Sequence, residues 1–67
     1  MPEQILGTNM WQLLDNEFVE GAGGRIDGPT VLRIHLFYNP KMMFVQSGNK
    51  KIELPGENFE LQVKTKS

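Results

Sequence analysis

The side chains best suited to acid–base chemistry are the single histidine, His35, and two glutamates, Glu53 and Glu60, which we expect opposite each other on adjacent strands. A general base needs an orienting group and a nucleophile or substrate beside it. The neighbours expected for His35 are Gln46 and Lys51, which do not complete a triad. Two carboxylates without further oxygen ligands make a poor calcium site. The sequence therefore predicts no catalytic residues, no metal site and no cofactor, and we expect a protein that is not an enzyme.

The glycine-rich stretch GAGGR, residues 21–25, has the glycines of a phosphate-binding loop. Such a loop follows a strand, opens a helix and carries a lysine followed by serine or threonine. Here the following residues, 26–36, have the composition of a strand, and that lysine is missing. We therefore expect residues 21–29 to be a loop that divides the domain into an N-terminal element, residues 1–20, and a C-terminal part.

The length of 67 residues allows one domain, residues 1–67, of marginal stability. Without cysteine the domain has no disulfide, so packing or oligomerisation must support it. No apolar stretch reaches the roughly 18 residues of a membrane span, and the first ten residues lack the features of a secretory signal. We expect a cytoplasmic protein that does not contact membranes.

Charge is unevenly distributed along the chain. The net charge of −1 argues against general binding to polyanions. Residues 1–20 carry −4 and residues 21–67 carry +3. This distribution is typical of an ordinary solvated surface, and it would also let the two parts attract each other within or between chains.

The C-terminal part, residues 30–65, predicts a four-stranded antiparallel meander. Runs rich in β-branched and aromatic residues alternate with short stretches of turn residues. Short strands joined by short turns are antiparallel neighbours. The expected strands are residues 30–38, 41–46, 50–54 and 58–65, with turns at 39–40, 47–49 and 55–58.

The hairpin register follows from turns placed at Pro40-Lys41 and Gly48-Asn49, with the 55–58 loop setting the last pair. These three choices agree on one apolar face, and a one-residue slip would reverse it. The rows expected on that face are Tyr38, Met43, Leu54 and Phe59, then Leu36, Val45, Ile52 and Leu61. The rows expected on the opposite face are His35, Gln46, Lys51 and Gln62, then Phe37, Phe44, Glu53 and Glu60, with Met42 beyond Phe44.

The N-terminal element is predicted to be a short helix over residues 9–20. Met10, Leu13, Leu14 and Phe18 have helical spacing, and the glycines after residue 20 would end the helix. A helix of this kind would cover one apolar face of the sheet. The predicted fold is therefore α+β, a short N-terminal helix packed on a four-stranded antiparallel meander.

The alternative is an all-β small barrel with an N-terminal hairpin. In that fold the chain would turn at Asp15-Asn16, with Leu13 opposite Phe18. Ile5, Leu6 and Trp11 would then cover the second face of the meander within the same chain.

The apolar residues on that second face are the most informative functional feature. Large apolar side chains on an uncovered sheet face mark an interaction site, and aromatic residues and Met are enriched at interface centres. We expect a protein-interaction or assembly module that binds itself as a homo-oligomer, or another protein. The expected interface residues are Phe37, Met42 and Phe44, with Trp11 as a second anchor.

The alternative partner is single-stranded nucleic acid. Aromatic side chains on a sheet face beside basic residues form stacking sites for bases. The residues that would do this are Arg33, Phe37, Phe44 and Lys51, although Glu53 and Glu60 in the same rows would repel phosphates. No motif in the chain resembles that of a known family.

Overall fold

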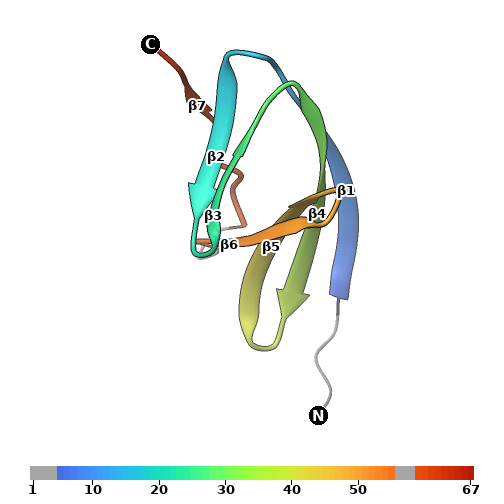
Figure 1. The fold of residues 1–67 in the computed structure, drawn as a ribbon. Helices are drawn as coiled ribbons and strands as arrows, with labels where there is room; N and C mark the ends of the chain where they lie inside the picture. Colours follow the sequence, from blue (N-terminus) through green and yellow to red (C-terminus); the bar gives the residue numbers. More distant parts are fainter. Residues whose placement is uncertain (1–4, 56–58) are drawn as a thin grey trace.

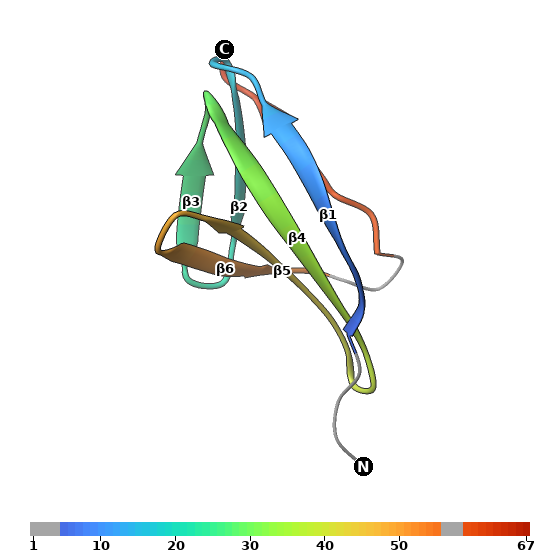
Figure 2. The same ribbon diagram turned by 90° about the vertical axis from the view of Figure 1, so that its right-hand side faces the viewer.

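The computed structural model describes residues 5–55 and 59–67, with side chains described from Asn9 onward. All regular structure in these ranges is β, and it forms two antiparallel sheets (Figures 1 and 2). The sheet orders are β1-β4-β5-β6 and β3-β2-β7. The strands are β1 (Ile5–Leu13), β2 (Glu17–Gly21), β3 (Gly24–Asp27), β4 (Thr30–Tyr38), β5 (Lys41–Ser47), β6 (Lys50–Leu54) and β7 (Lys64–Thr65).

The predicted helix over residues 9–20 is wrong, and so is the α+β class. These residues contain the end of β1, a turn at Asp15-Asn16 and the start of β2. β1 pairs along its whole length with β4, so tertiary pairing overrides the helical spacing of the apolar residues. That spacing does not describe one buried face, because Leu13 is buried whereas Leu14 is 53% exposed.

The small barrel is wrong as well. The chain does turn at Asp15-Asn16, where the Glu17 N–H donates to the Leu14 carbonyl at 3.0 Å. The strands on either side then enter different sheets, so Leu13 lies opposite Thr30 and not opposite Phe18. The two sheets do not close into a barrel.

The first half of the molecule is one long, bent β-hairpin (Figure 1). Its first arm is β1 followed by β2, its second arm is β3 followed by β4, and the two arms are antiparallel in both sheets. The chain reverses at Ala22-Gly23, where Gly23 has φ of 102°, a conformation that glycine adopts readily. Residues 21–29, expected as a loop, therefore contain the strand β3.

The bend of the hairpin depends on close backbone contact at Gly28. The Gly28 N–H donates to the Glu17 carbonyl at 2.9 Å. A Cβ at this position would overlap the carbonyl oxygen of Leu14. Only glycine therefore allows the two arms to approach where they pass from one sheet to the other.

The predicted meander is confirmed for β5 and β6 and shifted for β4 and β5. Val45 lies opposite Ile52 and Met43 opposite Leu54, as predicted. Between β4 and β5 the turn lies at Asn39-Pro40, one position earlier than expected, so the pairing differs by two residues. Because side chains alternate with a period of two, this shift leaves every residue on its predicted face. Tyr38, expected in the core, lies at the sheet end and is 63% exposed.

The fourth strand of the large sheet is β1, and not residues 58–65 as predicted. Residues 59–63 form no strand, and Phe59, Leu61 and Val63 instead pack against the core from this segment. Of the predicted 55–58 loop, residues 56–58 lie outside the described residues, as do the side chains of Ile5 and Leu6.

The core lies between the large sheet and the β2–β3 hairpin. We call the side of the large sheet that contributes to it the inner face. Buried apolar side chains of this size each stabilise the fold by about 1.5–3 kcal/mol relative to exposure. The buried residues of the described part of the chain are Leu13, Val19, Ile26, Leu32, Ile34, Met43, Val45, Ile52 and Leu54. That part of the chain contains no helix that is long and apolar enough to cross a membrane.

β7 attaches the end of the chain to β2. Phe18 lies opposite Lys64, and the Lys66 N–H donates to the Asn16 carbonyl at 2.7 Å. Beside this short ladder the Lys64 Nζ donates to Glu20 Oε1 at 2.9 Å. Phe18 and Lys64 are far apart in the sequence, and no local pattern indicates that they pair. Sequence analysis therefore does not predict this ladder.

The ion pair should be visible in the titration of Glu20. The hydrogen bond from Lys64, followed by its charge, lowers the pKa of the Glu20 carboxyl below its ordinary value. Because the folded-state pKa is depressed, the stabilisation is present above the unfolded-state pKa and is lost as pH falls through the folded-state pKa. In a carbon-detected NMR titration we expect Lys64→Met to raise the pKa of Glu20. Lys66→Met, as control, should leave it unchanged, and equal pKa values in wild type and Lys64→Met would contradict the ion pair.

Candidate binding face

The surface of the large sheet that points away from the core is the outer face. Register and alternation place on it every second residue of β4, β5 and β6, together with Met10 and Gln12 of β1, which lie opposite Arg33 and Val31. Its residues are Met10, Gln12, Val31, Arg33, His35, Phe37, Met42, Phe44, Gln46, Lys51 and Glu53. Each of them is exposed or half-buried.

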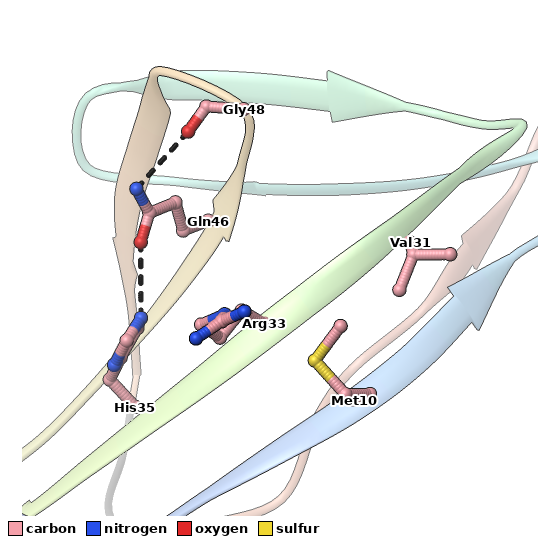
Figure 3. A pocket seen from close by; sticks show the side chains of 6 residues that line it. All are labelled: Met10, Val31, Arg33, His35, Gln46 and Gly48. Atoms are coloured by element: carbon pink, nitrogen blue, oxygen red, sulfur yellow. Dashed lines mark hydrogen bonds between the residues drawn. The ribbon is translucent and has the colours of Figure 1, made fainter.

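An open groove of about 440 Å³ crosses one end of the outer face. Figure 3 shows Met10 and Val31 on one side of it, His35 and Gln46 on the other, and Arg33 between them. Gly48 also lines the groove. Met10 is 58% and Val31 49% exposed, so the groove combines an accessible apolar side with a polar one.

The polar side is held by a short hydrogen-bond chain (Figure 3). Gln46 Nε2 donates to the Gly48 carbonyl at 3.1 Å. Its Oε1 lies 3.1 Å from His35 Nε2, and because a carbonyl oxygen only accepts, Nε2 carries the proton. In neutral His35 the other ring nitrogen, Nδ1, is then the acceptor. The hydrogen bond therefore orients the imidazole, with Nε2 directed at Gln46.

An aromatic cluster occupies the next part of the outer face. The rings of Phe37 and Phe44 meet edge to face, with centroids 5.8 Å apart and planes at 87°, a favoured aromatic geometry. The Lys51 Nζ lies 5.2 Å from the Phe44 centroid, which adds a cation–π contact. Both rings are half-buried, and Met42 lies opposite Phe37. The Phe37 and Phe44 rings are therefore packed against each other rather than separated.

The structure brings most of the predicted site residues together. Phe37, Met42 and Phe44 share the outer face, and so do Arg33 and Lys51. Trp11 does not join them. It lies opposite Leu32 and so on the inner-face side of β1, where it is 46% exposed.

The predicted glutamate pair does not form. On the side of β6 that faces away from β5, Glu53 exchanges two backbone hydrogen bonds with Ala22, at 2.9 and 3.0 Å. Glu60 therefore does not lie opposite Glu53 on a neighbouring strand. Glu60 belongs to the segment outside the strands. Within residues 5–55 and 59–67, no three His, Cys, Asp or Glu side chains gather as metal ligands.

Arg25, from the glycine-rich stretch, is engaged within the β2–β3 hairpin. Its guanidinium lies 3.9 Å from the Phe18 ring centroid, and its Nε donates to Asp27 Oδ1 at 2.6 Å. This hydrogen bond lowers the pKa of the Asp27 carboxyl. Arg25 therefore lies in the other sheet and does not contribute to the outer face.

Sequence reasoning missed two groove residues, Met10 and Val31. Val31 belongs to the alternating set of residues 31, 33, 35 and 37, so period-two alternation along β4 was the signal for it. Met10 had no such signal once residues 9–20 were assigned to a helix. The chain matches no family model, no curated protein and no solved structure.

Proposed function

We propose that this chain is a non-enzymatic binding module that contacts another protein through the outer face. One observation carries the proposal. The inner face already completes the core, and yet the outer face presents accessible Met10 and Val31 beside the half-buried Phe37 and Phe44. Apolar side chains gathered on a face that needs none for folding mark an interaction site, and Met and aromatic residues are enriched in interfaces.

The charges of the outer face indicate the chemistry of the partner. Arg33 lines the groove between its apolar and polar sides, and Lys51 lies at the aromatic cluster. Glu53, opposite Phe44, is the acidic residue of this face. An extended peptide with apolar side chains for Met10 and Val31 and a carboxylate for Arg33 would therefore complement the groove.

A peptide selection tests the proposal directly. Peptides displayed on phage are selected on immobilised wild-type protein, and the binders are measured by fluorescence anisotropy. We expect enrichment of apolar residues next to Asp or Glu. Val31→Ser and Arg33→Glu should each weaken the selected peptides by about tenfold or more, as truncated contact residues do.

The matched control is Leu14→Ser. Leu14 is apolar and 53% exposed, close to the exposure of Val31, but it follows the end of β1 and does not line the groove. Its variant should bind the selected peptides like wild type. The proposal fails when no peptide is enriched, or when Leu14→Ser weakens binding as much as Val31→Ser does.

Single-stranded nucleic acid is a second candidate partner, favoured by one observation. Arg33 and Lys51 share the outer face with Phe37 and Phe44, as in sites that stack bases beside a basic groove. Binding of a labelled oligothymidine should then weaken with salt and be lost in the Arg33→Glu and Lys51→Glu double variant. Absence of binding at low salt would remove this candidate and leave the peptide proposal untouched.

A further inference from the structure

The outer edge of β1 is an open strand edge. β1 pairs with β4 on one side only, and it is the first strand in the order of the large sheet. Among the described residues, no backbone hydrogen bond outside this ladder involves Ile5–Leu13. Figure 1 shows β1 at the rim of the large sheet. The backbone groups of β1 that point away from β4 are therefore available to another strand.

This edge lacks the features that protect other strand edges from pairing. Natural edge strands carry charges or proline, are very short, or are covered. The sequence of β1, ILGTNMWQL, contains no charged residue and no proline over nine residues. Its one irregularity lies between Ile5 and Gly7, which leaves Gly7–Leu13 in regular register.

The opposite edge of the same sheet shows the contrast. β6 is five residues long and contains Lys50, Lys51 and Glu53. Part of its edge is already paired, because Glu53 bonds to Ala22. The edge of β6 is charged and partly paired, whereas the edge of β1 is uncharged and unpaired among the described residues. β1 is therefore the edge available for pairing.

We propose that the free edge of β1 pairs antiparallel with β1 of a second copy of this chain, joining the two four-stranded sheets into one continuous sheet. This inference deepens the proposed function and rests on it, because it names a second copy as one protein partner. It uses the sheet edge and Met10 at the rim of the groove, and it leaves Val31, Arg33 and the polar side of the groove free for a peptide.

A second copy fits this edge because a two-fold axis brings β1 against itself. A charge on the axis would then face its own copy, and charges beside the axis would lie close to theirs. β1 has no charged residue. Met10 and Trp11 flank the edge on opposite sides of the sheet, 58% and 46% exposed. Self-pairing would therefore bury apolar surface on both sides of the joined sheet.

A register with Met10 on the two-fold axis fits best. Met10 would meet its own copy on the outer face, and Asn9 would lie opposite Trp11 of the other chain on the inner-face side. The two grooves, each with Met10 on its wall, would then adjoin across the axis. The uncharged residues 9–12 would form the centre of the contact.

Because the chain has no cysteine, single cysteine variants report only on pairing between copies. With Met10 on the axis, two cysteines introduced at position 10 lie within the roughly 4.4–6.8 Å Cα separation of a disulfide. Two cysteines introduced at position 12 are offset by four residues, about 13 Å. Under mild oxidation we expect Met10→Cys to form a covalent dimer and Gln12→Cys to remain monomeric. Cross-linking that is absent or equal across variants at residues 9–12 overturns the pairing.

Light scattering on a sizing column gives the second measurement. Wild type should have twice the mass of one chain, and Met10→Lys, which places like charges on the axis, should have the mass of one. The control is Val31→Lys on β4, which is similarly exposed but not at the edge and should keep the dimer. A monomeric wild type, or a dimer unaffected by Met10→Lys, overturns the inference.

Hydrogen exchange of wild type covers the case in which a variant does not fold. Alternate amides of β1 should exchange more slowly as protein concentration rises, and concentration-independent exchange overturns the self-pairing. Peptide binding by a wild-type chain that proves monomeric would still support the proposed function, so the two failures are distinguishable.

Discussion

Replacing Leu32 with alanine should lower the free energy of unfolding by about 2–5 kcal/mol. Leu32 is fully buried at the centre of the inner face, so the truncation removes transfer free energy and leaves a cavity. A domain of this size has a total stability of roughly 3–10 kcal/mol, and the variant would therefore lose a large part of it. Urea unfolding followed by circular dichroism measures the change.

The neighbouring residue provides the control. Val31 directly precedes Leu32 in β4, but its side chain points to the outer face and is 49% exposed. Val31→Ala should change the free energy of unfolding by less than about 1 kcal/mol. Equal losses for the two variants would contradict the assignment of inner and outer faces, on which both the core and the candidate binding face depend.

Gly28→Ala should destabilise the fold by about 3 kcal/mol or more, at the upper end of overpacking effects. The added Cβ would overlap the backbone of Leu14, where no side chain can rotate away. Relief would require the two arms of the bent hairpin to separate, with loss of the Gly28 hydrogen bond to Glu17. Thermal unfolding by calorimetry would show the effect as a lowered Tm and enthalpy.

Gly48→Asn is the matched substitution at another turn. Gly48 has φ of 59°, and a Cβ there meets no atom within 4 Å. Asn accepts this left-handed conformation with little strain, so the loss should stay below about 1 kcal/mol. A tolerated Gly28→Ala would mean that the hairpin bend is not closely packed.

Local signals explain what the sequence predicted correctly. The pairing of Val45 with Ile52 follows from a turn of two residues between short strands, and it was predicted residue by residue. The β4–β5 pairing was two residues off, but alternation kept each side chain on its face. For that reason Phe37 and Phe44 were correctly placed together, opposite the core.

Pairing between strands that are far apart in the sequence explains the parts of the fold that sequence analysis does not predict. Nothing in residues 5–13 indicates locally that they pair with β4. The spacing of the apolar residues from Met10 to Phe18 fits a helix as well as it fits a strand. Without that strand, Trp11 could not be assigned to a face and Met10 could not be placed at the groove. The end of the chain was missed in the same way, because β7 pairs with β2 from the far end of the sequence.

The bent hairpin also determines whether the molecule can be divided. Each of its arms continues from one sheet into the other, β1 into β2 and β3 into β4. A chain cut between the sheets would sever both arms, and each fragment would lose part of the shared core. The two sheets share one core and both arms of the hairpin, so we expect them to unfold together in a single transition.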